Sequence, residues 1–409
     1  MDVSLVFAVV AGIIVIGFVG EFFFKKTGIP IFIFLILTGI ILGPVLNIFP
    51  RQSVIPVLAP VAELTLLLVL FSSGLGLKSS VVLLYGGRAL VQATIYVGLS
   101  FVIIGAIGIF IMKWGILPSF ILSSMISGET TAALLVPLSR WTKISEDTAS
   151  FLKIEAAINS ILLVILFFAF VDVYNSPGIT FSATFNGVAS QFSVGIVVGA
   201  ILSLAWVYVL YRFQKEKFTY VLTLGLILIT YAVSTQLGGN GNLAVLVFGI
   251  IFGNYYIVNK LFRRKMNLDY IQSEMGGFQQ EISFLLTTLL FVFLGVTFLI
   301  TPAHIATNLS IALTVLLLLL ACRFVATNVS THKSQLSNEK KEIILMCAQG
   351  LTPATLAILA VSLQLPQADT FVNIVTYVII LTNIVTTSAA IAILQKREDS
   401  NTTDLKGTA

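Results

Sequence analysis

Residues 127–137 read SGETTAALLVP and residues 350–356 read GLTPATL, and both stretches lie inside long apolar runs. Residues 128–134 align with residues 350–356 as G-x-T-x-A-x-L. Glycine and proline weaken the backbone hydrogen bonding of a helix, and backbone groups freed in hydrocarbon need a buried or hydrated setting. The two stretches therefore predict a pair of broken helices that cross near the middle of a membrane.

The predicted breaks lie at Gly128 in the first stretch and at Gly350, Thr352 and Pro353 in the second. Half-helix ends at such breaks offer partial charges and free carbonyl groups to an ion, a pattern found in secondary transporters. The alternative is that Gly128 and Gly350 only allow close packing between helices.

The composition of the whole chain indicates an all-α polytopic membrane protein. Of its 409 residues, 57% are hydrophobic and 10% are charged, and the mean hydropathy is +1.03; soluble domains carry roughly 25% charge. Apolar runs of about 20 residues, long enough to cross a bilayer of about 30 Å as a helix, recur along the chain. The predicted thirteen transmembrane helices cover residues 4–24, 30–48, 57–77, 89–112, 117–139, 149–172, 190–212, 218–237, 241–259, 280–300, 303–328, 342–363 and 369–394.

Lys and Arg residues alternate with these spans as the positive-inside rule requires. With the N-terminus outside, all but three of the 23 Lys and Arg residues fall on the inner side; Arg51 and Lys113 lie outside and Arg323 lies within a span. The alternation predicts a multi-pass protein of the cell membrane with a short cytoplasmic tail at residues 395–409. The pI of about 9.1 therefore reflects orientation in the membrane rather than nucleic-acid binding.

The thirteen spans can be divided into two halves of opposite orientation. The fifth span runs inward and the twelfth outward, as an inverted repeat of spans 1–6 and 8–13 requires. The two discontinuous helices then occupy equivalent positions in the two halves. The seventh span, residues 190–212, is left as a linker helix.

Four acids and one base lie clearly within the predicted spans: Glu21, Glu63, Glu129, Glu155 and Arg323. Ionisable residues are costly in a bilayer, so each is a functional candidate unless it forms a structural ion pair. Counted at about 1.5 Å per residue from the inner ends of their spans, Glu155 and Arg323 lie at the same level. We predict a structural pair between them, with a direct role of either residue in transport as the alternative.

Three polar clusters share a depth near the midplane of the predicted bundle. They contain Glu129 in the fifth span, Asn159 and Ser160 in the sixth, and residues 350–355 in the twelfth. Glu63 lies in the outer third of its span, where it could add a ligand, guard the passage or form a hydrogen bond in a scaffold. Glu21 is expected at the inner interface of the membrane.

Four further segments follow one another along the chain: GIPIFIFLILTGIILGP (28–44), AELTLLLVLFSSGL (62–75), LGGNGNLAVLVFGIIFGN (237–254) and EISFLLTTLLFVFLGV (281–296). In this order, together with Arg323 and the two broken helices, they resemble the monovalent cation:proton antiporters of the sodium/proton exchanger branch. The resemblance implies secondary active transport by alternating access, without a cofactor, in a homodimer embedded in the lipid bilayer.

The same resemblance implies one membrane transport domain over residues 1–394 with two regions. Helices at about 4–77 and 218–300 would form a scaffold and the dimer interface. Helices at about 89–172 and 303–394 would form the mobile core that carries the ion.

The chain departs from the family pattern at two positions. In the sixth helix such proteins typically have Glu, three residues, and then Asn-Asp, with the Asp as ligand of the cation and the proton. Here Glu155 is followed at this spacing by Asn159 and Ser160. In the fifth helix a typical Thr-Asp-Pro aligns with Thr130, Thr131 and an alanine. Both aspartates are absent.

Glu129 stands one residue before the matched Thr130, where the family has no acid as a rule. Our hypothesis is that the ion-binding carboxylate has moved from position 160 to Glu129, which would bind Na⁺ or K⁺. Thr130, Thr131, Asn159 and Ser160 would supply the neutral oxygens that hard cations prefer. One free carboxylate carries either one cation or one proton, which predicts electroneutral exchange.

Three other classes of function stay open. The absent aspartate at Ser160 favours an uncoupled cation transporter, a leak or a sensor derived from the antiporter fold. An intramembrane enzyme is disfavoured because the sequence has two histidines, His304 and His332, both expected in loops, and no nucleophile-base pair or phosphate loop. A proton-coupled carrier for another solute, such as an anion, is disfavoured by the acid at the site.

Overall fold

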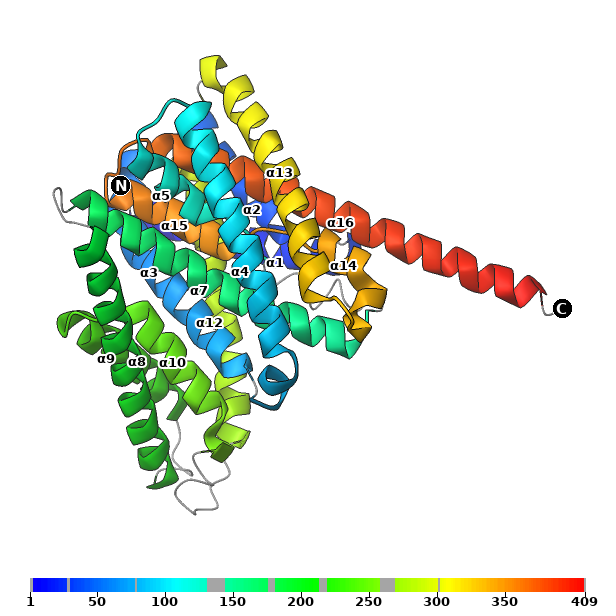
Figure 1. The fold of residues 1–409 in the computed structure, drawn as a ribbon. Coiled ribbons are helices and arrows are strands. Elements are labelled where there is room, and N and C mark those ends of the chain that lie inside the picture. The colour runs from blue at the N-terminus through cyan, green and yellow to red at the C-terminus, as the bar shows by residue number, and fades with distance from the viewer. Residues whose placement is uncertain are drawn as a thin grey trace. The chain divides into compact units, whose positions relative to one another are not determined.

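A computed structural model of the chain describes residues 3–27, 30–77, 79–130, 144–175, 181–212, 219–257, 269–300 and 302–407. Within these ranges every regular element is helical (Figure 1), which confirms the predicted all-α class. The elements are α1 (Val3–Thr27), α2 (Ile31–Ile40), the π-helix η1 (Ile41–Val45), α3 (Arg51–Gly76), α4 (Ser79–Phe110), α5 (Ile116–Ile126), α7 (Glu146–Asn175), α8 (Phe181–Arg212), α9 (Thr219–Gln236), α10 (Gly241–Gly253), α12 (Asp269–Thr297), α13 (Pro302–Ser330), the 3₁₀-helix η2 (Gln335–Glu339), α14 (Lys340–Leu345), α15 (Leu351–Ser362) and α16 (Ala368–Gly407).

Seven of the described helices are long and apolar enough to cross a membrane: Arg51–Gly76, Val82–Phe110, Glu146–Asn175, Asn186–Leu210, Thr219–Gln236, Pro302–Ser330 and Ala368–Ile393. Shorter apolar helices cover Ala11–Phe24, Ile31–Val45, Ile116–Ile126, Gly241–Gly253, Glu281–Thr297 and Leu351–Ser362. Each predicted span overlaps one of these segments. The count of thirteen crossings and the inverted repeat stay predictions.

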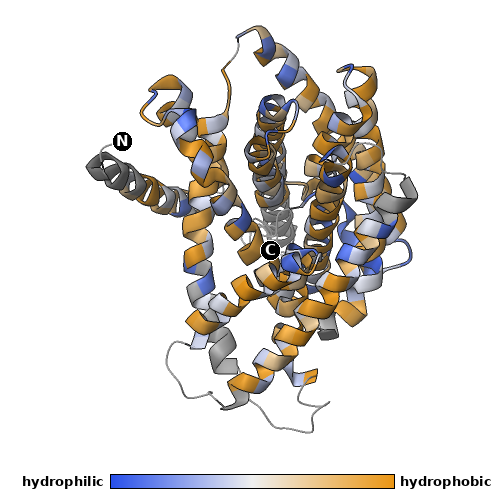
Figure 2. Cartoon of the chain, turned by 90° about the vertical axis from the view of Figure 1, so that its left-hand side faces the viewer, coloured by the Kyte–Doolittle hydropathy of each residue, from blue (hydrophilic) through white to orange (hydrophobic). Residues whose placement is uncertain are grey.

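The helices carry apolar side chains on their exposed surfaces as well as in their contacts. Figure 2 shows apolar residues along most of the coloured helices. Phe18, Leu83 and Phe110 are 70%, 87% and 71% exposed in the isolated chain. A helix that is apolar on both its packed and its exposed side is typical of a membrane span, because lipid replaces water at the exposed side.

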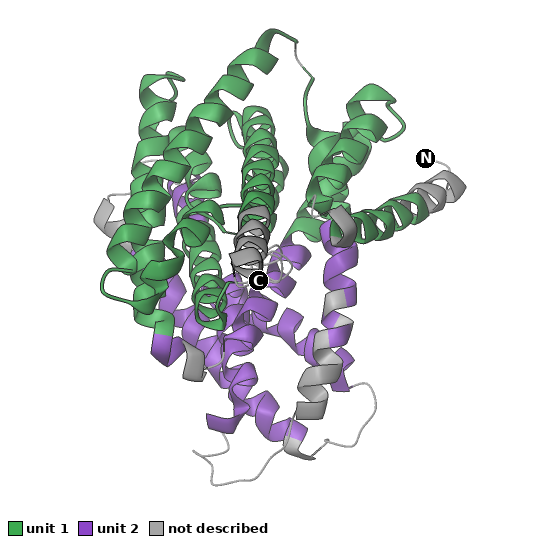
Figure 3. Ribbon diagram, turned by 90° about the vertical axis from the view of Figure 1, so that its right-hand side faces the viewer, with its two compact units in different colours: residues 1–62, 85–167, 288–409 green, residues 63–84, 168–287 purple. Residues whose placement is uncertain are grey.

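The chain forms two compact units, shown in Figure 3. Unit 1 comprises residues 1–62, 85–167 and 288–409, and unit 2 comprises residues 63–84 and 168–287. The predicted division into scaffold and core regions stays a prediction.

The core of unit 2 is an apolar cluster contributed by α3, α8, α9 and α10 and the residues just after α10. Its members are Leu67, Phe71, Val207, Leu210, Ile227, Val245, Phe248, Phe252 and Tyr255. Helices α8 and α10 approach closely at Gly199, where a Cβ atom would lie 2.2 Å from the carbonyl oxygen of Ala244. Small residues that let two backbones approach in this way are a main source of helix association in membranes.

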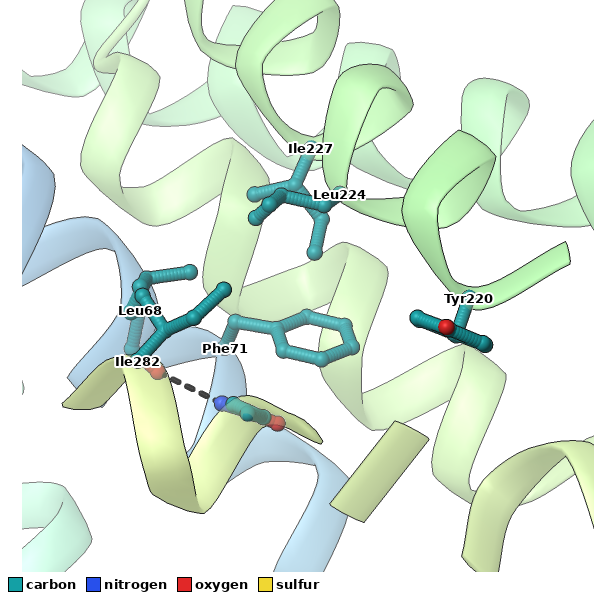
Figure 4. Close-up of a pocket in the computed structure, with 7 residues that line it drawn as sticks. Leu68, Phe71, Tyr220, Leu224, Ile227 and Ile282 are labelled. Atoms are coloured by element: carbon teal, nitrogen blue, oxygen red, sulfur yellow. Dashed lines mark hydrogen bonds between the residues drawn. The ribbon is translucent and has the colours of Figure 1, made fainter. Parts of the chain in front are cut away.

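A small pocket in unit 2 is lined mainly by apolar side chains (Figure 4). Its residues are Leu68, Phe71, Tyr220, Leu224, Ile227, Gln279 and Ile282. The Gln279 side-chain amide donates a 2.8 Å hydrogen bond to the carbonyl oxygen of Leu68. The lining has no charged side chain, so this pocket is not a candidate for the ion site.

In unit 1, α2 packs against the end of α12. A Cβ atom at Gly39 would lie 2.0 Å from the carbonyl oxygen of Val292, and the rings of Phe32 and Phe291 stack with centroids 4.4 Å apart. The α2 helix then widens into η1 around Pro44, which has no N–H to donate to a regular α-helical ladder. These contacts hold α2 against the end of α12.

Candidate functional site

The predicted twelfth span is interrupted between α14 and α15. Helix α14 ends at Leu345, residues 346–350 are not helical, and α15 begins at Leu351 with Gly350 at its N-cap. Gly350 therefore lies in the interruption, whereas Thr352 and Pro353 lie in the first turn of α15. Proline is tolerated there because the first N–H groups of a helix have no partner within the helix.

Side chains of α16 satisfy backbone groups that the interruption leaves free. Thr382 Oγ1 accepts a 3.1 Å hydrogen bond from the backbone N–H of Gln349, and Asn383 Nδ2 donates a 2.6 Å bond to the carbonyl of Gln349. Thr386 Oγ1 donates a 3.1 Å bond to the carbonyl of Leu345. This set of polar residues was not among those predicted from the sequence, although three polar side chains at i, i+1 and i+4 in an apolar helix are a signal for it.

The predicted fifth span also stops short. Helix α5 ends at Ile126, and Gly128 adopts a left-handed conformation with φ of +78°. A Cβ atom at this position would lie 3.1 Å from the ring of Tyr96, so glycine suits it for both conformational and steric reasons. The next described residues are Glu129 and Thr130. Thr131 and the rest of the predicted span lie outside the described residues.

The two interrupted segments are in contact through polar groups, and α5 and α15 lie side by side (Figure 1). The Gln349 side-chain amide donates a hydrogen bond to the carbonyl of Ile126, the last residue of α5. The backbone N–H of Gly350 donates a 2.8 Å bond to Glu129 Oε2, and that of Thr352 donates a 3.2 Å bond to Glu129 Oε1.

The carboxyl group of Glu129 therefore caps the N-terminus of α15. Its side chain is buried, with 2% of the residue exposed. Backbone N–H groups at a helix N-terminus lack partners within the helix and carry a partial positive charge, so they stabilise a negative group. This explains how an acid can be buried here without a basic partner among the described residues.

Arg323 of α13 lies at the other side of the interruption. Its Nη1 and Nη2 donate bonds of 2.8 and 3.1 Å to the two carboxylate oxygens of Glu155, and both residues are fully buried. Its Nε donates a 2.8 Å bond to the carbonyl of Ile343 in the last turn of α14, and Nη1 also reaches Thr130 Oγ1 at 2.9 Å. The guanidinium lies 5.0 Å from the ring centroid of Tyr96.

Each of the two helix ends that face the interruption therefore contacts a side chain of favourable charge. Arg323 bonds to the C-terminal turn of α14, where the helix dipole is negative, and Glu129 bonds to the N-terminus of α15, where it is positive. Arg323 and Glu155, which depth alone placed at one level, are in direct contact.

Asn159 and Ser160 lie on α7 close to this ion pair. Asn159 Nδ2 donates a 3.1 Å bond to Glu155 Oε1, and its Oδ1 has no hydrogen-bond partner among the described residues. Ser160 Oγ donates a 3.1 Å bond to the carbonyl of Ala156, so its lone pairs remain available.

One predicted site residue belongs to the other compact unit. Glu63 is part of unit 2. The described residues contain no group of three or more His, Cys, Asp or Glu that could hold a metal ion. Oxygen atoms near the interruption include those of Glu129, Thr130, Asn159 and Ser160. Gln349 Oε1, Thr352 Oγ1 and Asn383 Oδ1 also lie there, buried and without a hydrogen-bond partner among the described residues.

The model of the transmembrane sodium/hydrogen exchanger family matches residues 8–396. The chain belongs to this family. Its fold is that of the sodium proton antiporter MjNhaP1 from Methanocaldococcus jannaschii, with a TM-score of 0.83 at 20% identity over 96% of this chain and 100% of that one. A second structure of the same antiporter gives a TM-score of 0.76 at 21% identity.

Curated relatives of this exchanger chain are named K⁺/H⁺ antiporter NhaP2. The protein from Shewanella sp. strain MR-4 is 25% identical over 385 residues, which cover 90% of this chain and 63% of the relative. The protein from Shewanella oneidensis is 25% identical over 236 residues, which cover 56% of this chain and 40% of the relative. The chain therefore spans less than two thirds of the length of these relatives.

Proposed function

We propose that the chain exchanges a monovalent cation, Na⁺ or K⁺, for protons by alternating access at a site centred on Glu129. Membership of the sodium/hydrogen exchanger family supports the general part of this proposal, the exchange of a cation for protons. The observation that carries the proposed site is the burial of the Glu129 carboxyl group where the two interrupted segments meet.

The Glu129 carboxylate has lone pairs left with which to bind a cation. An ionised carboxylate offers about four lone-pair sites, and two of those on Glu129 accept backbone N–H groups. We assign Thr130, Asn159 and Ser160 as neutral oxygen ligands, and Thr131 of the segment outside the described residues as a further one. Asn159 Oδ1 supports this assignment because it is buried without a partner in the described part of the chain.

The charges support exchange of one cation for one proton. The bidentate contact with Arg323 compensates the charge of Glu155, which leaves Glu129 as the carboxylate available for exchange. A cation and a proton do not readily share one carboxylate, because protonation removes the charge that attracts the cation. Glu129 therefore carries one cation in one direction and one proton in the other, with no net movement of charge.

The choice between Na⁺ and K⁺ is open in this proposal. The Shewanella relatives are named for K⁺ and the archaeal structure for sodium. We further propose a homodimer in the cell membrane, with the N-terminus outside, the C-terminus in the cytoplasm and a mobile core moving against a scaffold. The alternation of Lys and Arg residues along the sequence supports this orientation.

A second candidate function is uncoupled cation transport, a leak or a sensor. Two observations favour it: Ser160 stands where the family resemblance expects an aspartate, and both oxygens of Glu129 already accept hydrogen bonds from α15. In that case Glu129 would only stabilise the broken helix.

The two functions can be separated by flux measurements in proteoliposomes. Proton flux is recorded with a pH-sensitive dye while Li⁺, Na⁺ or K⁺ is added across a pH series, for the wild type, Glu129→Gln and Ser160→Asp. Exchange predicts cation-dependent proton flux that is lost in Glu129→Gln. Cation flux without proton flux in the wild type would establish the uncoupled alternative instead.

A further inference from the structure

One face of α16 contacts the ends of two other helices, all through residues of unit 1. Asp369, Asn373 and Tyr377 are spaced at i, i+4 and i+8 along α16 and therefore form one stripe on this helix. Asp369 forms an ion pair with Arg51, the first residue of α3. The ring of Tyr377 meets that of Phe298, just after α12, edge to face with centroids 5.5 Å apart. The stripe therefore joins α16 to the start of α3 and the end of α12.

Asn373 makes the central contact of the stripe, and its partner is backbone. Its Nδ2 donates a 3.0 Å bond to the carbonyl of Leu299, and its Oδ1 accepts a 3.0 Å bond from the N–H of the same residue. Leu299 lies beyond the end of α12 at Thr297, so these two groups are outside the hydrogen-bond ladder of that helix. Asn373 is only 5% exposed. A single amide therefore satisfies both backbone groups of Leu299.

The end of α12 that the stripe contacts is packed closely against α2 and η1. A Cβ atom at Gly43 would lie 2.8 Å from the Cα atom of Val296, and one at Gly295 would lie 2.2 Å from the carbonyl oxygen of Ile36. Small residues that let two backbones approach in this way favour tight helix pairs in membranes. The stripe therefore bonds to a closely packed pair of helices rather than to a free chain end.

The opposite face of α16 supports the interruption at the proposed exchange site. Thr382 accepts the N–H of Gln349 there, and it follows Asn373 by nine residues. Nine residues are about two and a half turns of an α-helix, or about 14 Å along its axis, and point to opposite sides. One helix therefore contacts the interruption on one side and the ends of α3 and α12 on the other.

We propose that Asp369, Asn373 and Tyr377 form the outer gate of the exchanger. The gate rests on the proposed exchange by alternating access, in which a core that includes α16 moves against a scaffold that includes α2, α3 and α12. The proposed orientation places Arg51, Leu299 and the start of α16 at the outside. The gate is closed while the three contacts are made, and it opens when α16 moves away from α3 and α12.

The strength of the contacts suits a gate that opens in every cycle. The side chains of Arg51 and Asp369 are 25% and 51% exposed, and water weakens an ion pair at such positions. The backbone groups of Leu299 follow a helix end, where water can take the place of the amide when the gate opens. The pair of Arg323 and Glu155 is fully buried instead, so breaking it is costly, and it stays closed within the core.

The first test measures access to a cysteine placed behind the gate. Thr376 is fully buried in the same turn of α16, and Thr376→Cys is the reporter. The rate of its reaction with a maleimide is measured on the purified full chain in detergent. The background from the two native cysteines, both buried, is measured in the chain without the reporter and subtracted.

Reversing charges at the gate should change this rate in a defined order. Asp369→Arg repels Arg51 and should raise the rate about two- to five-fold, the range that a weak surface ion pair supports. Adding Arg51→Asp restores an ion pair of reversed polarity and should return the rate to its starting value. The matched control Glu146→Arg reverses an exposed acid of α7 and should leave the rate unchanged. A rate that Asp369→Arg does not raise, that Arg51→Asp does not lower again, or that Glu146→Arg raises equally would overturn the proposal.

The second test locks the gate. Arg51→Cys and Asp369→Cys are combined and joined by a short bifunctional thiol reagent that can be cleaved by reduction. Cation-dependent proton flux in proteoliposomes should be lost on cross-linking and return on reduction, while each single-cysteine variant treated in the same way keeps its flux. Full flux in the cross-linked protein would contradict the gate. Labelling does not need exchange, so a chain that labels as expected but shows no flux before cross-linking would refute the exchange proposal and not the gate.

Discussion

The substitution Glu129→Gln separates two roles that the geometry gives to one side chain. As an ion ligand, Glu129 supplies the charge that a cation or a proton neutralises. As a helix cap, it accepts the N–H groups of Gly350 and Thr352 at 2.8 and 3.2 Å. Glutamine keeps the shape and one acceptor oxygen but places an NH₂ group against the second backbone donor.

The cost to stability follows from these contacts. A hydrogen bond to a charged group contributes about 1.5–3 kcal/mol, and the interaction of a charge with a helix terminus contributes about 0.3–1 kcal/mol at exposed positions and up to about 2 kcal/mol where it is partly buried. Losing one such bond and the charge together should destabilise the protein by about 2–5 kcal/mol. We expect a fold that survives with a lower melting temperature and no cation-dependent proton flux.

A matched control disturbs the same junction without removing a charge. Gln349→Leu removes the amide that bonds to the carbonyl of Ile126, and an unsatisfied buried acceptor costs about 1–3 kcal/mol. Flux in proteoliposomes and melting temperature are measured for both variants. Lost flux in Glu129→Gln beside retained flux in Gln349→Leu, at a similar loss of stability, supports the ligand role. Cation-dependent proton flux that persists in Glu129→Gln would refute it and leave Glu129 as a cap only.

Three further substitutions test other contacts. Arg323→Met should cost about 3–5 kcal/mol because it leaves the buried charge of Glu155 unpaired, and adding Glu155→Leu should recover part of the loss in thermal unfolding. Ser160→Asp introduces a second carboxylate, so its exchange rate should respond to an imposed membrane potential where the wild-type rate does not. Gly128→Ala should destabilise by about 1–2 kcal/mol, because alanine is strained at φ of +78° and its Cβ meets Tyr96; a melting temperature equal to that of the wild type would contradict this.

The positions of the apolar helices could be predicted from the sequence because length and hydropathy alone define them. The contact between Arg323 and Glu155 could be anticipated as well, since a helix rises by a constant distance per residue and the bilayer gives both spans a common reference. The depth of a residue in the bilayer does not show in which direction its side chain points around the helix axis. Counting along the spans therefore placed Glu129, Asn159 and residues 350–355 at one level without showing which of them bond to each other.

What the sequence could not supply is the partner of each freed backbone group. The break was expected around Gly350, Thr352 and Pro353, but α15 begins at Leu351, so the unwound residues precede the proline. The side chains that hold them belong to Thr382 and Asn383 of α16, which lie 33 and 34 residues after Gln349. Pairings of this kind depend on helix rotation and tertiary packing, which a single sequence does not encode in a readable pattern.

The electrostatics of the interruption give a physical reason for coupled exchange on the proposed mechanism. Glu155 is compensated by Arg323, so the empty site differs from the loaded one by the charge of Glu129. The N-terminus of α15, equivalent to roughly half an elementary charge, offsets that charge only in part. An empty site therefore carries a residual negative charge that is costly to move through hydrocarbon, whereas a site loaded with either a cation or a proton has no such charge on Glu129. Because only the loaded forms cross cheaply, outward movement of one ion must be matched by inward movement of the other.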